Sequence, residues 1–283
     1  MYALLKSCFS WWRGAAFEHL PPLVLINGLA EQASSWYCNR AWWSHYFDVK
    51  VPELLIYEGE VLHRRIADGA PITVDYFTEQ LETYLDTFVQ TPPYHLVASS
   101  LGGQIALNYA ARHPDRVARL VLLCPSGLGL EERLPVVEGV RSNDHATMLT
   151  SIFYNPRAAN PGLLRHYQKM FGNKQWKKGI LRTVRGTSSH RAHSILPRVT
   201  APTLIICGQE DRIVNTAEIL EAVKGLSNFR TYVIPRCGHA PQIERPRLVN
   251  RLVRNFCLGE DPVSELATPR PVFAPPVLAP SAS

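Results

Sequence analysis

The feature that most constrains this chain is a series of short, almost wholly apolar runs separated by segments with helical periodicity. The clearest runs cover residues 22–26, 94–98, 117–124 and 202–207. Continuous apolar runs of this length are typical of strands buried on both faces. Strands that alternate with helices form a parallel sheet through right-handed crossovers. The sequence therefore predicts an α/β fold with a doubly wound, mostly parallel sheet.

Weaker patterns complete the predicted order of elements. Further strands are expected at residues 47–51 and 229–234. Helices are expected at residues 33–46, 74–89, 101–113, 216–226 and 247–256. This order of elements lies between residues 22 and 256, and no internal repeat is evident.

The segment after Cys124 differs from the rest. Residues 127–197 are polar and helical in pattern, and prolines interrupt them. A segment this long is unusual as a plain connection within a domain, so a helical cap over one end of the sheet is predicted. The core is then expected to comprise residues 1–126 and 198–258. Residues 259–283, rich in Pro, Ala and Ser, are expected to form a flexible tail.

Composition excludes several other classes of protein. The net charge of +6 over 283 residues is only mildly basic and accompanies no nucleic-acid-binding motif. No run approaches the ~20 apolar residues of a membrane span, and residues 1–17 are a poor secretory signal. Six dispersed cysteines without a C-x-x-C pair indicate reduced thiols. We therefore expect a cytoplasmic protein without a nucleic-acid partner or a membrane span.

Ser100 is the first candidate for chemistry. It joins a buried strand directly to a helix, with the small residues Ala98 and Gly102 two positions before and after it. A tight turn of this kind raises the hydroxyl group above the sheet and points the N–H groups of the helix start at the same place. The N–H of Leu101 is thus a candidate donor to a developing oxyanion. The alternative is an ordinary helix N-cap serine.

A serine nucleophile needs a base, and the base needs an acid that orients it. Asp211 follows the strand at residues 202–207, and His239 follows the strand at 229–234. Polar groups beyond the carboxyl ends of parallel strands gather at one edge of the sheet. The order Ser, Asp, His predicts a triad of Ser100, Asp211 and His239. Glu210 remains a competing acid.

At this point the chain resembles the α/β-hydrolase superfamily. The resemblance rests on INGLAEQASSW, VASSLGGQIALNYAARHPDRVARLVLL, APTLIICGQEDRIV and IPRCGHAPQIERP, which occur in order from residue 26 to residue 246. It implies the triad roles given above, with no metal or organic cofactor. It also implies that the N–H of Leu29 is the second oxyanion donor, and it makes Asn27 and Gly28 candidate substrate contacts. Asn27 stands where the family usually has histidine, and the D-x-x-G-x-G turn after the second strand is missing.

Two features leave the substrate open. CPSGLG and CGHAPQIE resemble carbon–carbon bond hydrolases of aromatic ring-fission products, although that group usually has tryptophan where this chain has Ile243. The resemblance also leaves two other functions open. One is a ligand receptor that keeps the triad but turns over its ligand very slowly, and the other is a perhydrolase or haloperoxidase side activity. A carboxylic ester hydrolase that forms an acyl-enzyme is the first expectation.

The predicted cap carries its own signals. Between Leu128 and Arg198 there are 12 basic and 4 acidic residues, which is typical of a surface that attracts an anionic substrate. The alternative is a solvated helical face. Phe153, Tyr154 and Trp176 are candidate substrate contacts, or they only hold the cap helices together.

Overall fold

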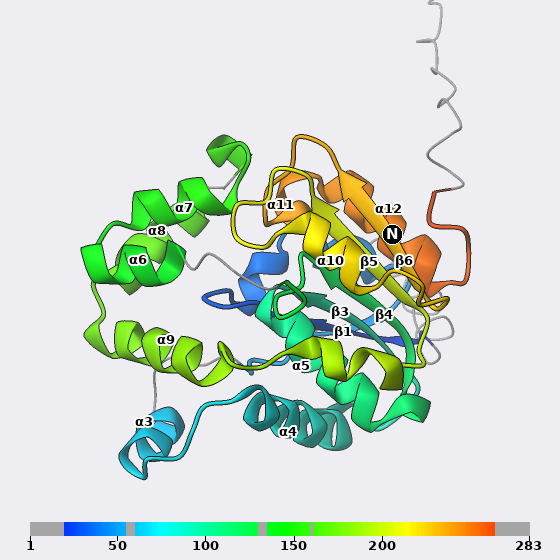
Figure 1. The fold of residues 1–283 in the computed structure, drawn as a ribbon, viewed down its shortest axis with the longest axis horizontal. Helices are drawn as coiled ribbons and strands as arrows, with labels where there is room; N and C mark the ends of the chain where they lie inside the picture. Colours follow the sequence, from blue (N-terminus) through cyan, green and yellow to red (C-terminus); the bar gives the residue numbers. More distant parts are fainter. Residues whose placement is uncertain (1–19, 55–59, 130–134, 159–160, 264–283) are drawn as a thin grey trace, which may run out of the picture.

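A computed structural model of the chain describes residues 20–54, 60–129, 135–158 and 161–263. Its centre is a sheet of six parallel strands in the order β2-β1-β3-β4-β5-β6 (Figure 1). The strands are β1 (Pro22–Ile26), β2 (Asp48–Lys50), β3 (Tyr94–Ser99), β4 (Val117–Leu123), β5 (Thr203–Gly208) and β6 (Phe229–Ile234). This confirms the predicted doubly wound sheet. The direction of winding reverses between β1 and β3, which is where ligands bind in sheets of this kind.

Alternate residues of the central strands enter two separate hydrophobic cores. In β4, Leu120 and Leu122 face one core, whereas Val121 and Leu123 face the other. The first core is completed by helices α4 (Val74–Tyr84), α5 (Leu101–Arg112) and α10 (Thr216–Ala222), and the second by α2 (Arg40–Trp43) and α12 (Pro246–Cys257). Both faces are therefore covered, and this explains why the strands read as unbroken apolar runs.

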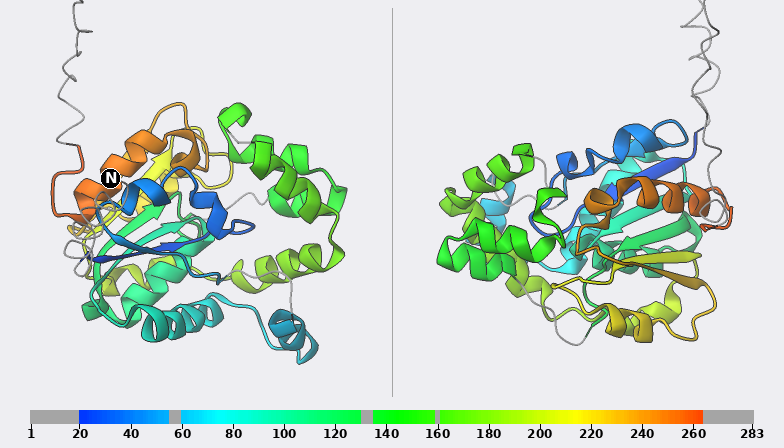
Figure 2. Two further views of the ribbon diagram at one scale, coloured as in Figure 1. Left: turned by 180° about the vertical axis from the view of Figure 1, so that it is seen from behind. Right: turned by 90° about the horizontal axis from the view of Figure 1, so that it is seen from above.

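Helices also fill the long connection between β4 and β5. They are α6 (Pro135–Ser142), α7 (His145–Ile152), α8 (Pro161–Phe171) and α9 (Lys174–Thr187). Figures 1 and 2 show them as a group set to one side of the sheet. Among the described residues, no helix has both the length and the apolar character needed to cross a bilayer. Most of the predicted tail, residues 264–283, lies outside the described residues.

Two predicted helices differ from the structure. Residues 33–46 form a short 3-10 helix (Ala33–Trp36) followed by α2, not one helix. The break occurs at Asn39, whose buried amide group donates hydrogen bonds to Gln242 and Asn250 near the other end of the chain. Helix α10 ends at Ala222, before the predicted residue 226, and Gly225 with its left-handed backbone (φ +85°) lies in the turn that follows. A further helix, α3 (Glu60–Ala67), was not predicted.

Candidate active site

Ser100 lies in a strained turn between β3 and α5. Its φ of 49° and ψ of −118° are unusual for a residue with a side chain. The turn needs Gly102, because a Cβ there would lie 2.5 Å from the carbonyl oxygen of Asn27. This close contact seats the start of α5 against the end of β1 and leaves the Ser100 side chain in a cavity at the edge of the sheet.

His239 approaches Ser100 from the turn after β6. Its Nε2 atom lies 2.9 Å from the Oγ of Ser100, and its Nδ1 atom lies 2.7 Å from the Oδ2 of Asp211. The turns after β5 and β6 abut closely, since a Cβ on Gly208 would lie 2.1 Å from the carbonyl oxygen of Gly238. The structure thus brings together the three residues singled out in the sequence.

Asp211, and not Glu210, contacts the histidine. Its Oδ1 accepts hydrogen bonds from the N–H groups of Ile213 (2.8 Å) and Val214 (3.1 Å). Glu210 instead accepts a hydrogen bond from the N–H of Cys237. Burial tends to raise the pKa of Asp211, but attraction to His239 and the hydrogen bonds to it bring the pKa below its ordinary value. Asp211 is therefore held as a carboxylate beside the imidazole.

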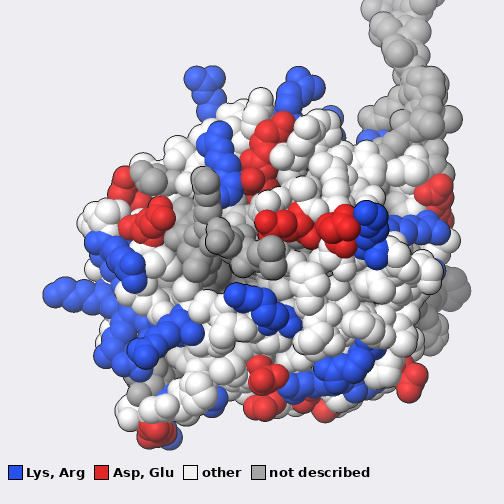
Figure 3. Space-filling view, viewed as in Figure 1, with Lys and Arg blue, Asp and Glu red and all other residues white. Residues whose placement is uncertain are grey.

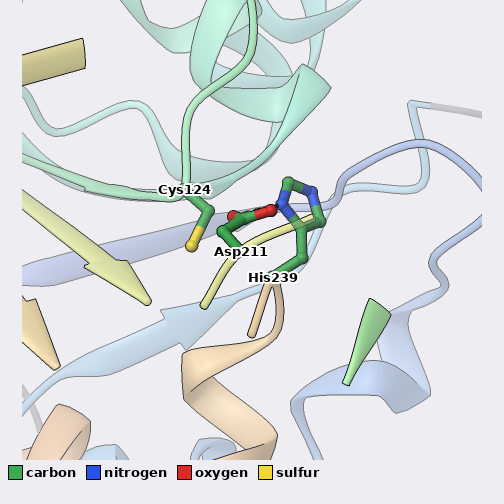
Figure 4. A group of neighbouring side chains, drawn as sticks. All are labelled: Cys124, Asp211 and His239. Atoms are coloured by element: carbon green, nitrogen blue, oxygen red, sulfur yellow. Dashed lines mark hydrogen bonds and ion pairs between the residues drawn. The ribbon is translucent and has the colours of Figure 1, made fainter. Parts of the chain in front are cut away.

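Cys124 lies behind this pair. Figure 4 shows its sulfur on the side of Asp211 away from His239, and the potential ligand atoms of the three residues lie within 4.8 Å of one another. A metal ion would need a thiolate there, but burial raises the pKa of the Cys124 thiol. The oxygen and nitrogen atoms of Asp211 and His239 already contact each other. The donor set therefore fits a hydrogen-bonded pair better than a metal site.

The two predicted oxyanion donors both border the cavity that contains Ser100. Leu29 follows β1 and Leu101 begins α5. Within the described part of the chain, neither backbone N–H donates a hydrogen bond to a protein atom. Asn27 and Gly28 do not line the cavity. Asn27 accepts a hydrogen bond from the indole N–H of Trp36 at 2.5 Å, and so braces the turn that carries Leu29.

The cavity has a volume of about 260 Å³, and most of its walls are apolar. These walls come mainly from the segment between β4 and β5 and from the turns after β5 and β6: Met148, Ile152, Phe153, Leu163, Val184, Ile213 and Ile243. One part of the lining is polar and includes Gln104, Ser126, His190 and Arg191. Gln104 contacts Ser126 at 2.6 Å and His190 at 3.0 Å.

Of the three predicted aromatic contacts, only Phe153 lines the cavity. Tyr154 is exposed at the surface, with 41% of its area accessible. Trp176 is buried against Phe171, where it packs helices α8 and α9 together. Sequence reasoning missed two acidic residues near the triad, Glu31 and Glu244. Their signal is a lone carboxylate three residues after Gly28 in the first case and five residues after His239 in the second.

The chain is similar in sequence to known proteins over most of its length. The model of the family described as "alpha/beta hydrolase fold" matches residues 21–246. Human monoacylglycerol lipase ABHD6 is 24% identical over 273 residues, covering 88% of this chain and 78% of its own length. The 2-hydroxy-6-oxo-6-phenylhexa-2,4-dienoate hydrolase of Comamonas testosteroni is 30% identical over 176 residues, covering 57% of this chain and 62% of its own length.

Solved structures agree in fold. A crystal structure described as a putative lipase from Acinetobacter baumannii AYE superposes with a TM-score of 0.71 and 22% identity, over 85% of this chain and 84% of the other. The meta-cleavage product hydrolase of Pseudomonas fluorescens IP01 superposes with a TM-score of 0.69 and 21% identity, over 84% of this chain and 91% of the other.

Proposed function

The chain belongs to the α/β-hydrolase family, and on that premise we propose that it hydrolyses carboxylic esters through an acyl-enzyme formed on Ser100. The observation that carries the proposal is the continuous contact from Asp211 through His239 to Ser100, with 2.7 Å and 2.9 Å between the successive atoms. These distances are within hydrogen-bond range for a nucleophile, a base and an orienting acid.

In the proposed mechanism, the Oγ of Ser100 attacks the ester carbonyl carbon while the Nε2 of His239 takes the hydroxyl proton. The N–H groups of Leu29 and Leu101 stabilise the negative oxygen of the tetrahedral intermediate. Collapse of the intermediate breaks the ester C–O bond, and His239 gives its proton to the departing alcohol. Water then attacks the acyl group with His239 again as base. Release of the acid returns the proton to Ser100. Asp211 stabilises the imidazolium form in both halves.

The cavity favours an ester with a flexible apolar acyl chain. Its apolar walls suit an acyl chain, and its volume of about 260 Å³ is modest. Together with the likeness to monoacylglycerol lipase ABHD6, this makes esters with one acyl chain on a small alcohol our leading substrate class. We also propose that helices α6–α9 act as a cap, because Met148 of α7, Leu163 of α8 and Val184 of α9 all line the cavity.

A carbon–carbon bond hydrolase is the second candidate. The polar part of the cavity, with Gln104, His190 and Arg191, favours a substrate that carries polar groups at one end. The likeness to the Comamonas enzyme points the same way. Ile243 lines the cavity where that group usually has tryptophan, and this favours the ester.

The test is labelling with a fluorophosphonate probe, followed by turnover of aryl esters of increasing chain length and of a ring-fission product. Ser100→Ala should abolish labelling and ester turnover. Ser99→Ala should keep labelling, because the Ser99 hydroxyl is buried and donates to Glu31 and not to His239. Labelling that survives Ser100→Ala would remove the proposed nucleophile. Turnover of the ring-fission product alone would favour the second candidate, and tight binding without turnover would indicate a receptor.

A further inference from the structure

Glu31 is a buried acidic residue that the proposed mechanism does not use. It lies in the turn after β1, two residues beyond Leu29, and lines the same cavity as Ser100 and His239. Burying a carboxylate is costly unless donors surround it. The contacts of Glu31 therefore need an explanation.

The Glu31 carboxylate joins three segments that carry the site. Its Oε2 accepts a hydrogen bond from the N–H of Gly28 at 2.7 Å, on the turn that bears Leu29. Its Oε1 accepts one from the hydroxyl of Ser99 at 3.0 Å, next to the nucleophile. The side-chain amide of Gln242, three residues after His239, lies 3.4 Å from the same oxygen.

The turn after β1 and the turn after β3 are closely packed against each other. A Cβ on Gly28 would lie 2.9 Å from the Cβ of Ser100, so a shift of the turn after β1 is felt directly at the nucleophile. Donors to an oxyanion are effective only when they are fixed before charge develops. Without Glu31, the N–H of Gly28 would lose its partner in a largely buried place, which costs free energy and favours movement of the turn.

Glu31 also acts on His239 through its charge. Glu31 and His239 line the same cavity, and opposite charges interact strongly where water is excluded. The charge of an ionised Glu31 favours the imidazolium form of His239, and the reciprocal attraction opposes the effect of burial, which raises the pKa of Glu31. Among the described residues, other titratable groups near the histidine include Asp211 and Cys124 and Glu244, which accepts a hydrogen bond from the N–H of Gly238. Tyr167 of α8 lines the same cavity as Glu31.

We propose that Glu31 is a positioning residue that locks the oxyanion turn after β1 against the nucleophile turn after β3. This rests on the proposed function, since it needs Ser100 and His239 to act as nucleophile and base. It assigns no contact with substrate to Glu31.

The test uses the full chain with Glu31→Ala, Glu31→Gln and, as matched control, Glu79→Gln, which changes an exposed glutamate on α4. The measurements are kcat and KM for p-nitrophenyl butyrate, the rate of fluorophosphonate labelling, and the pH profile of kcat/KM. Thermal unfolding of each variant establishes that the protein assayed is folded.

We expect Glu31→Ala to lower kcat by about 10- to 100-fold, as for a lost buried hydrogen-bond partner, with KM nearly unchanged. Glu31→Gln keeps one acceptor and should recover part of kcat. Both variants should move the acid limb of the pH profile to lower pH, because the imidazolium loses a stabilising charge. Glu79→Gln should match the wild type.

Folded Glu31 variants with wild-type kcat and an unshifted acid limb would overturn the inference while leaving the proposed function in place. A fall in kcat that only tracks loss of folded protein would overturn it too, because it would indicate a purely structural role. A wild-type protein that neither labels nor hydrolyses esters would instead remove the proposed function, and the inference with it.

Discussion

The backbone N–H of His239 donates a hydrogen bond to the carbonyl oxygen of Ile152, at a distance of 2.7 Å. Ile152 is the last residue of α7, and Phe153 after it forms part of the cavity wall. The wall of the cavity is therefore attached directly to the residue proposed as the base. Movement of α7 and the position of the imidazole cannot be independent.

Glu244 strengthens this attachment. Its carboxylate accepts hydrogen bonds from the N–H groups of Gly238 (2.7 Å), Tyr154 (3.2 Å) and Asn155 (3.0 Å). We expect Glu244→Ala to lower the rate of fluorophosphonate labelling by about 10-fold or more, because three donors lose their acceptor and the histidine turn loosens. Glu221→Ala, which removes an exposed ion pair with Lys224, is the control and should label normally. Normal labelling of Glu244→Ala would show that the histidine turn holds its geometry without the carboxylate.

The neighbouring acids allow a second comparison. Asp211→Asn should lower kcat by about 10³- to 10⁴-fold, since a neutral amide neither stabilises the imidazolium nor enforces the tautomer. Glu210→Gln should have a much smaller effect, because the Glu210 carboxylate accepts a hydrogen bond from the N–H of Cys237, whereas Asp211 contacts the imidazole. Steady-state kinetics on one aryl ester separates the two, and the reverse ranking would reassign the acid.

Glu31 should leave a signature in the pH dependence of stability. Because its pKa is raised in the folded protein, the folded state binds more protons than the unfolded state between the unfolded and the folded pKa. The contribution of Glu31 to the free energy of unfolding is therefore largest below the unfolded pKa, and it is lost as pH rises through the folded pKa. Relative to the wild type, Glu31→Gln should gain stability as pH rises through this range. Urea unfolding at a series of pH values measures the difference, which should stay constant for Glu79→Gln. A constant difference for Glu31→Gln as well would contradict the expectation.

The basic side chains near the cavity lead to a salt-dependent prediction. Figure 3 shows lysine and arginine gathered over α6, α8 and α9, where exposed residues include Arg141, Lys169, Lys174, Lys178 and Arg182. If this surface steers anions, kcat/KM for an ester that carries a carboxylate should fall as salt rises, while that of a neutral ester of matched length should not. The pair Lys174→Glu and Lys178→Glu should reduce the preference for the anionic ester, and Lys224→Glu, on the turn after α10, should not. Equal salt responses of the two esters would identify the surface as solvated only.

The strands and the three residues at the centre of the site were predictable because their signals are local. The apolar run at residues 117–124 reflects a strand buried on both faces, and Ser100 is distinguished by Ala98 and Gly102 within two positions. Glu31 was not predictable in this way. Its partners Gly28, Ser99 and Gln242 come from distant parts of the chain, so only the folded protein reveals that the carboxylate is enclosed.

The same reason explains the wrong helix at residues 33–46. Its spacing of tryptophans favours a helix, but the Asn39 side chain gains hydrogen bonds to Gln242 and Asn250, and these tertiary contacts outweigh local propensity. Which residues line the cavity was likewise not readable in advance. Phe153 and Trp176 are both aromatic residues of the segment between β4 and β5, and the sequence does not distinguish their roles. Of the two, Phe153 lines the cavity and Trp176 does not.

The backbone of Ser100 has a consequence for the stability of the whole chain. Its left-handed conformation costs roughly 1–3 kcal/mol for a residue with a side chain, whereas glycine adopts it freely. Ser100→Gly should therefore melt at a higher temperature than Ser100→Ala, although both lack the hydroxyl; equal melting temperatures would mean that the turn is relaxed. Since proteins sit only slightly above the stability they need, this strain is a cost in stability that the chain carries with serine at this position and would not carry with glycine.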